Sequence, residues 1–157
     1  MRVIGIDPGT IVCGYGIIDS VGSKMNAVCF GAIRVKKEAT FPERLVQIHK
    51  GLGEVIREHH PEVASVEQLF VGKSVKSAMR TGEGRGIAVL TAALEGLPVH
   101  EYTPAEVKKS VVGVGGAHKT QVQEMVRIIL GLAKVPRPQD AADALAIAIC
   151  HCQRVTF

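Results

Sequence analysis

The chain has 157 residues, of which 46% are hydrophobic and 22% charged, and its formal net charge is +4 at pH 7. These values are typical of a globular protein, and we expect residues 1–157 to form a single domain with a sizeable core. No apolar run is long enough to cross a bilayer. The strand-like segment that begins at Arg2 leaves no room for a signal peptide, so we expect a cytoplasmic protein. The basic charge favours an anionic partner. Because no apolar run could span a bilayer, we expect no membrane partner.

Three strand-like runs open the chain, each rich in Val and Ile and separated from the next by Pro-Gly or Gly-Ser turn signals. They cover Arg2–Asp7, Cys13–Asp19 and Ala27–Val35. Because the connections are short, we expect these strands to pair antiparallel. Apolar residues at helical spacing then predict a helix over Pro42–His60, and the run Val63–Leu69 predicts a fourth strand.

The second half of the chain alternates helical patterns with one more strand. Three glycines, at positions 82, 84 and 86, either weaken the first of these helices or let another element approach it closely. Thr103 marks the start of a short helix, because a proline follows it directly and a capping-box glutamate stands three residues later. The expected segments are a helix over Ser74–Leu94, a strand over Pro98–Tyr102, a glycine-rich loop over Val111–Ala117, and helices over Lys119–Leu132 and Gln139–Cys152.

This order of elements predicts an α/β fold. An antiparallel meander starts the sheet, and the strands that follow are separated by helices and should extend it in parallel. We therefore expect a five-stranded mixed sheet with helices on both faces.

Four carboxylates stand where apolar runs end or are interrupted. Asp7 and Glu67 each end a predicted strand, the edge of an open sheet where ligands bind. Asp140 and Asp143 lie three residues apart at the start of an Ala/Ile/Leu-rich helix, so they share a face of it. Oxygen ligands of this kind suit Mg²⁺ or Mn²⁺ rather than Zn²⁺. Two such ions could activate a water and stabilise the leaving oxygen of a phosphodiester.

Each acid also has a simpler explanation. Asp7 could belong to an Asp-Pro-Gly turn, Glu67 could be a solvated acid at a strand end, and Asp140 could be a helix N-cap. Asp143 is harder to explain in this way, because it interrupts an almost unbroken apolar helix. Together, the four favour one shared cation site.

Basic residues and one aromatic residue are candidates for nucleic-acid contact. Lys73, Lys76, Arg80 and Arg85 could bind phosphates, although a run of charge is usually a solvated helix face. Phe70 follows Glu67 by three residues and could stack on a base or pack in the core.

The segment from Gly113 to Thr120 nearly matches a nucleotide-binding P-loop. A P-loop needs glycine where His118 stands and normally follows the first strand, so we reject ATP binding here. Lys119 can still meet a phosphate, because flexible glycines precede it at a helix N-terminus.

Four strings, in this order, resemble the RuvC family of bacterial crossover junction endodeoxyribonucleases, and the likeness runs from Val3 to about Cys152. They are Gly5-Ile6-Asp7-Pro8-Gly9, Val66-Glu67-Gln68-Leu69-Phe70, Val107-Lys108-Lys109-Ser110-Val111-Val112-Gly113 and Asp140-Ala141-Ala142-Asp143-Ala144-Leu145-Ala146. The first string alone is weak, but the set is highly specific.

The resemblance implies an RNase H-like fold, a homodimer, and Mg²⁺-dependent resolution of Holliday junctions by paired nicks in recombination and repair. It implies RuvA and RuvB as partner proteins. The family's metal ligands fall on Asp7, Glu67, Asp140 and Asp143. The third of these positions is His in some members and Asp here. The base-stacking aromatic falls on Phe70, and the two functional lysines fall on Lys108 and Lys119.

The sequence therefore predicts a nuclease for four-way DNA junctions in which Asp7 bridges two metal ions. One alternative is a ribonuclease of the same fold that acts on RNA or RNA–DNA hybrids. Another is an actin-like nucleotide-binding module, for which 157 residues supply one lobe at most. A third is a junction-binding protein without activity.

Overall fold

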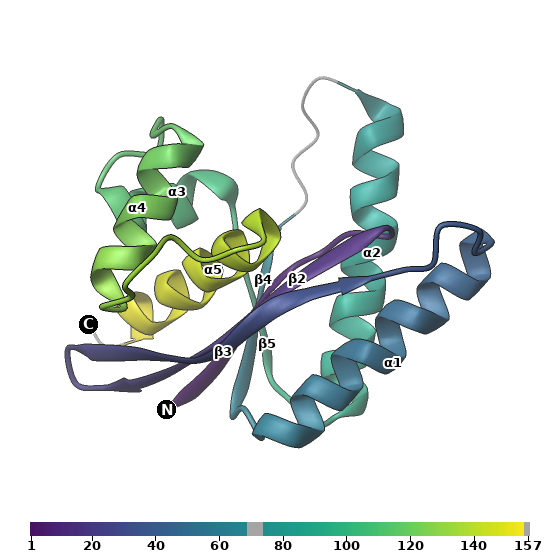
Figure 1. Ribbon diagram of the computed structural model, residues 1–157, viewed down its shortest axis with the longest axis horizontal. Coiled ribbons are helices and arrows are strands. Elements are labelled where there is room, and N and C mark those ends of the chain that lie inside the picture. The colour runs from purple at the N-terminus through teal and green to yellow at the C-terminus, as the bar shows by residue number, and fades with distance from the viewer. Residues whose placement is uncertain (69–73, 156–157) are drawn as a thin grey trace.

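The centre of the computed structural model, which describes residues 1–68 and 74–155, is a five-stranded sheet in the order β3-β2-β1-β4-β5 (Figure 1). The strands are β1 (Arg2–Asp7), β2 (Val12–Val21), β3 (Lys24–Arg34), β4 (Val63–Glu67) and β5 (Val99–Tyr102). β2 pairs antiparallel with β1 and with β3, whereas β4 pairs parallel with β1 and with β5. The predicted mixed sheet is confirmed.

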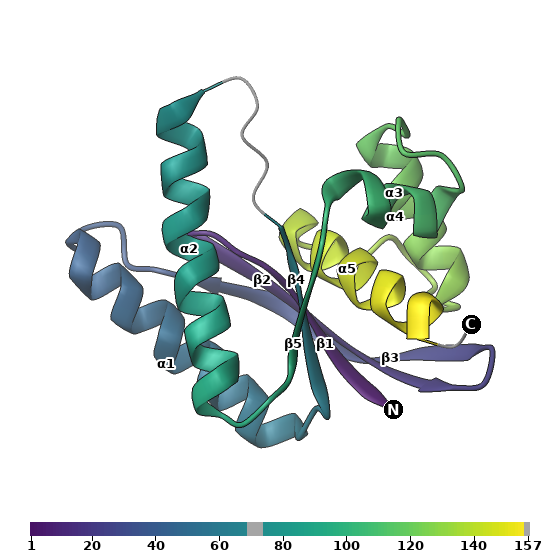
Figure 2. The same cartoon turned by 180° about the vertical axis from the view of Figure 1, so that it is seen from behind.

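Within the described residues, five helices cover the two faces of this sheet (Figures 1 and 2). They are α1 (Phe41–His59), α2 (Val75–Leu94), α3 (Pro104–Val112), α4 (Lys119–Ile129) and α5 (Gln139–Val155). Residues of α1 and α2 pack in one apolar cluster with one face of the sheet, and residues of α3, α4 and α5 pack in a second cluster with the other face. Among the described helices, none combines the length and the apolarity that a membrane span needs.

Alternation along the strands sorts their side chains between the two clusters. In β1, Ile4 and Ile6 pack toward α1 and α2, while Val3 packs toward α5. In β4, Ala64 and Val66 pack toward α1 and α2, and Val63 packs toward α5. Because successive side chains alternate, the last residue of each strand, Asp7 or Glu67, emerges on the face that α5 covers.

Several element boundaries differ from the predicted ones. The hairpin between β2 and β3 is longer than expected, because backbone pairing continues through polar residues up to Val21 and Lys24, next to the turn at Gly22. The loop predicted from Val111 starts later, because α3 runs to Val112 and ends at Gly113, whose φ is +88°. Helix α4 ends at Ile129, and α5 continues to Val155.

The glycines of α2 do not break the helix. At Gly84 an added Cβ would lie 2.9 Å from backbone atoms of Gly9, in the connection that follows β1. Of the two interpretations of these glycines, a weakened helix or the close approach of another element, the structure shows the close approach.

Candidate active site

Two of the four acids are brought together by the pairing of β1 and β4. These strands run parallel, and Ile6 is the register partner of Val66, so Asp7 and Glu67 leave neighbouring strands at the same end of the sheet. Both carboxylates face the side that α5 covers, and the carboxyl ends of parallel strands are where open α/β sheets bind ligands.

The other two acids lie in the first turns of α5. The carbonyl of Pro138 accepts hydrogen bonds from the backbone N–H groups of Ala141 and Ala142, at 3.0 and 3.4 Å. Asp140 is the second residue of the helix, which begins at Gln139. The alternative interpretation of Asp140 as an N-cap is therefore wrong, and its carboxylate remains available to the site. Asp143 follows one turn later.

Two glycines allow α5 to pack against the sheet at backbone distance. A Cβ on Gly14, the register partner of Asp7, would lie 2.1 Å from the carbonyl oxygen of Asp140. A Cβ on Gly5 would lie 2.0 Å from the carbonyl oxygen of Ala144. No contact that short is possible for a real Cβ. Sequence reasoning missed this role, although glycine within a strand is a known signal of close backbone approach.

All four acids line one cavity of about 380 Å³. Two lysines share it, Lys108 from α3 and Lys119 from the first position of α4. The Nζ of Lys119 lies 2.9 Å from Oδ2 of Asp143, and their side chains are 59% and 21% exposed. The rest of the lining is apolar or proline and consists of Pro104, Val107, Val122 and Ala146.

The carboxylates repel one another in a poorly solvated place. Burial, followed by the charges of Asp143, Glu67 and Asp140, raises the pKa of Asp7 from 3.8 to about 8. Burial and the charge of Asp143 likewise raise the pKa of Glu67, against the opposing charges of Lys119 and Lys108. Burial also raises the pKa of Asp143, although its hydrogen bond to Lys119 opposes the rise.

This concentration of half-buried negative charge fits a divalent cation. Four carboxylates with only hard oxygen donors match the preference of Mg²⁺ and Mn²⁺, and a cation would relieve the repulsion that raises the pKa of Asp7. Across residues 1–68 and 74–155, however, no group of three or more Asp, Glu, His and Cys side chains is already arranged to hold a metal ion. In this arrangement the ion pair with Lys119 turns one carboxylate oxygen of Asp143 toward an ammonium.

The fold places the predicted basic residues in different surroundings. Arg80 lines a neighbouring cavity of about 350 Å³ together with Asp7 and Asp140, so it reaches the edge of the acidic site. Lys76 is exposed on α2, one turn before Arg80. Arg85 forms an ion pair with Glu101 of β5 instead of standing free on the surface.

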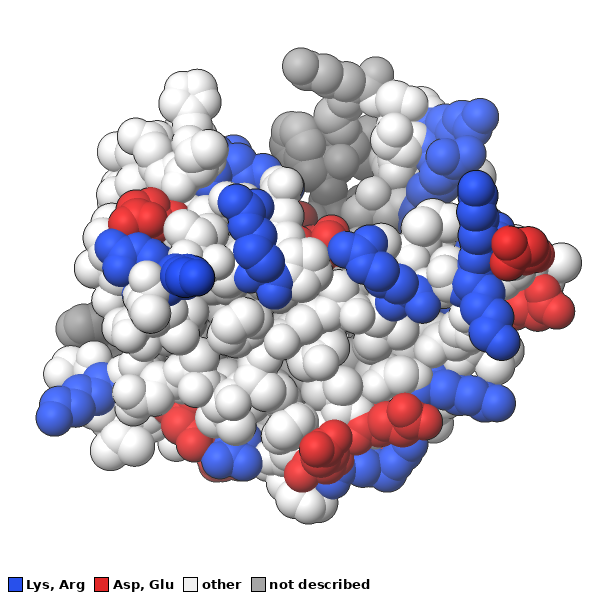
Figure 3. All heavy atoms as spheres, viewed as in Figure 1, with Lys and Arg blue, Asp and Glu red and all other residues white. Residues whose placement is uncertain are grey.

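Phe70 and Lys73 lie outside the described residues. On the described surface, basic side chains flank the acids: Figure 3 shows acidic atoms deep in a notch, with Lys and Arg side chains on both of its sides.

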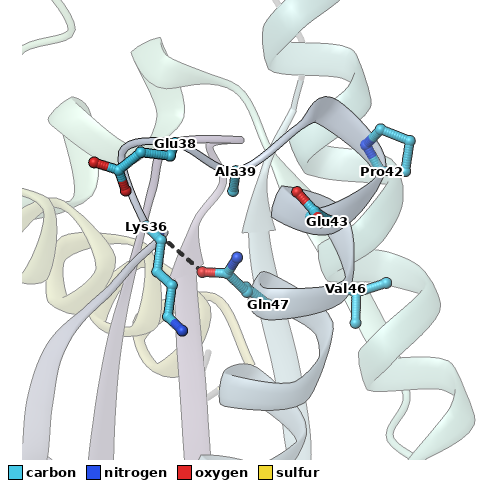
Figure 4. A pocket seen from close by; sticks show the side chains of 7 residues that line it. All are labelled: Lys36, Glu38, Ala39, Pro42, Glu43, Val46 and Gln47. Atoms are coloured by element: carbon cyan, nitrogen blue, oxygen red, sulfur yellow. Dashed lines mark hydrogen bonds between the residues drawn. The ribbon is translucent and has the colours of Figure 1, made fainter.

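A larger cavity, of about 560 Å³, lies away from the acids, between the connection after β3 and the start of α1 (Figure 4). Its polar groups serve local structure. Glu43 accepts hydrogen bonds from the backbone N–H and the hydroxyl of Thr40 and so caps α1, while Gln47 accepts one from the N–H of Lys36 at 2.9 Å. Its size alone does not make it a functional site. The four carboxylates and the two lysines line the smaller cavity instead.

Comparison with known proteins agrees with this geometry. The family model described as crossover junction endodeoxyribonuclease RuvC matches residues 3–151. The chain is 51% identical over 151 residues to the crossover junction endodeoxyribonuclease RuvC of Chloroflexus aurantiacus, and the match covers 96% of this chain and 92% of the relative. It is 48% identical over 157 residues to that of Dehalococcoides mccartyi, covering 100% and 94%.

A solved structure of T. thermophilus RuvC in complex with a Holliday junction substrate superposes with a TM-score of 0.92 at 36% identity, covering 99% of this chain and 95% of that one. The predicted RNase H-like α/β fold is thereby confirmed. The family model matches nearly the whole sequence, and about half of the residues are identical in the two relatives. The chain therefore belongs to the RuvC family of crossover junction endodeoxyribonucleases.

Proposed function

We propose that this chain resolves Holliday junctions by paired nicks, with a cluster of carboxylates as its metal-binding active site. The observation that carries the proposal is the cavity in which four carboxylates from β1, β4 and α5 meet two lysines from α3 and α4. Membership of a family of metal-dependent endodeoxyribonucleases supports the same conclusion.

The proposed metal ligands are Asp7, Glu67, Asp140 and Asp143. These residues would hold two Mg²⁺ ions, for which Mn²⁺ could substitute, and Asp7 would be the ligand that the two ions share. The raised pKa of Asp7 supports its central place, because the other three acids all contribute to it. When bound, the ions supply Lewis-acid activation of a water and stabilisation of the leaving oxygen.

The two lysines are proposed to act on the phosphate. Burial lowers the pKa of Lys119, but its hydrogen bond to Asp143 and the charges of Asp7 and Asp140 outweigh burial, and the pKa is raised. Lys119 therefore keeps its charge and can offset negative charge that develops on the phosphoryl oxygens. Lys108 shares the cavity and adds positive charge beside Glu67.

The remaining contacts complete the proposal. We assign stacking on an unpaired base to Phe70 and phosphate contacts to Lys73, Lys76, Arg80 and Arg85. Of these, Arg85 would first have to leave Glu101. Residues 1–157 act as one domain, and a two-fold homodimer places two active sites on two strands of equal polarity, which gives paired nicks. The proposed setting is the bacterial cytoplasm, with RuvA and RuvB as partner proteins.

One experiment tests this function directly. The chain is incubated with Mg²⁺ and, separately, a four-way DNA junction, a linear DNA duplex and an RNA–DNA hybrid of the same sequence. Cleavage of the junction at paired positions supports the proposal, whereas cleavage of the hybrid without cleavage of the junction would establish the ribonuclease alternative. Asp7→Asn should abolish cleavage and retain junction binding, because it removes a ligand and one charge that repels phosphate.

A further inference from the structure

A buried polar contact lies beneath α3, outside the acidic cavity. The hydroxyl of Tyr102 and Nδ1 of His151 form a hydrogen bond of 2.8 Å, in residues that are only 8% and 2% exposed. The ring centroids of His100 and His151 lie 4.8 Å apart. Polar groups buried in an apolar cluster are costly unless they are satisfied, and a satisfied pair fixes one arrangement of the elements that carry it.

Tyr102 links the strand that carries Glu67 to the helix that carries Lys108. It is the register partner of Glu67 and the last residue of β5, and its carbonyl accepts a hydrogen bond of 2.7 Å from the N–H of Gln68. The next residue, Thr103, caps α3 through its hydroxyl, and Lys108 follows on that helix. The backbone of Tyr102 therefore connects one proposed ligand to one proposed phosphate-binding lysine.

His151 belongs to the helix that carries the other two acids. It follows Asp143 by eight residues on α5, which is about 12 Å along a helix axis. Helix α5 thus carries two proposed ligands at its N-terminal end and contacts β5 and α3 near its C-terminal end. A firm attachment at that end fixes where Lys108 stands relative to Asp143.

Two other polar contacts between α3 and α5 are weaker. Glu106 pairs with Arg154 at 2.9 Å, but their side chains are 35% and 48% exposed, and exposed ion pairs contribute little. The hydroxyl of Ser110 donates to Sγ of Cys150 at 3.2 Å, and sulfur is a weak acceptor. The contact between Tyr102 and His151 is the well-buried one of the three.

We propose that Tyr102 and His151 are positioning residues of this enzyme, which act on cleavage through Lys108. Their hydrogen bond holds the start of α3 against α5, so that the Lys108 ammonium stands beside Glu67 when the phosphate arrives. This inference rests on the proposed function, since it assigns Lys108 a role in the cleavage step.

The test is single-turnover cleavage of a four-way junction with Mg²⁺, measured for Tyr102→Phe, Lys108→Ala and the double variant. Tyr102→Phe should lower the cleavage rate about tenfold with little change in junction affinity, because misplacing a catalytic group costs rate. In the Lys108→Ala background the same substitution should cost nothing further. Tyr15→Phe, at the only other tyrosine of the chain, is the matched control and should leave the rate unchanged.

A second pair of variants covers the case in which Tyr102→Phe fails to fold. His151→Asn keeps a polar atom near Nδ1 and should cleave faster than His151→Leu, which keeps none. Equal losses from Tyr102→Phe with and without Lys108, or equal rates for the two His151 variants, would overturn the positioning role. A wild-type chain that binds junctions but cuts none would overturn the proposed function itself, and this proposal with it.

Discussion

Gly14→Ala is the substitution that most directly probes how the fold sets the spacing of the acids. Gly14 pairs with Asp7 across β1 and β2 and lies beneath the first turn of α5. A Cβ there would meet the Asp140 carbonyl oxygen at 2.1 Å and the Asp140 Cβ at 2.9 Å. Both are backbone or near-backbone atoms, so no side-chain rotation can relieve the overlap.

The expected displacement follows from these distances. Ordinary van der Waals contact begins at 3.4 Å, so the start of α5 has to retreat by about 1.3 Å from the sheet. A misplacement of about 1 Å in a catalytic group costs roughly 100-fold in rate. We therefore expect Gly14→Ala to cut the single-turnover rate of junction cleavage by about 100-fold, or about 2.7 kcal/mol, and to require more Mg²⁺ for half-maximal rate.

The matched control is Gly86→Ala. Its added Cβ meets nothing within 4 Å, and the residue lies inside α2, where alanine is the better helix former by about 1 kcal/mol. It should cleave like the wild type and unfold at a slightly higher temperature. A Gly14→Ala protein that is folded, and that cleaves at the wild-type rate with unchanged Mg²⁺ dependence, would show that the packing of α5 on Gly14 does not set the spacing of the acids.

Three further predictions follow from the electrostatics. In metal-free protein, Asp7→Asn should raise the melting temperature, and the gain should grow as pH rises from 4 to 8, because the raised pKa of Asp7, about 8, makes ionisation cost stability above its ordinary 3.8. Burial, then the charge of His100, lowers the pKa of His151, so its contribution to stability should be present above pH 6.5 and lost as pH falls below that value; thermal melts of His151→Leu should show a flatter pH dependence. Lys119→Gln should slow cleavage by about 100-fold. If the ammonium contacts a phosphate in the complex, the slope of the logarithm of junction affinity against the logarithm of salt concentration should become shallower by about one. An unchanged slope would place Lys119 away from the phosphate.

The sequence was sufficient to predict the sheet and the sheet edge at which Asp7 and Glu67 lie. Val and Ile runs with short turns determine the antiparallel start, and strand ends place Asp7 and Glu67 at one edge. These features depend on local pattern and on general rules of strand pairing, which is why they could be read without a structure.

Contacts between distant segments could not be read in this way. The pairing of Lys119 with Asp143 depends on how α4 packs beside α5, and the pairing of Arg85 with Glu101 depends on how α2 crosses β5. Asp140 was ambiguous because helix caps and first-turn acids look alike in sequence. Gly14 gave a signal, since it interrupts a strand, but only the packing of α5 reveals what the missing side chain makes room for.

In the proposed active site, the acids of β1, β4 and α5 share bound cations. Crystals of the protein soaked in Mn²⁺ and measured for anomalous scattering test it most directly. We expect Mn²⁺ density between Asp7 and Asp143 that is lost in Asp7→Asn, with the Lys119 ammonium withdrawn from the Asp143 carboxylate. Mn²⁺ bound elsewhere in the molecule, with the ion pair between Lys119 and Asp143 intact, would contradict it.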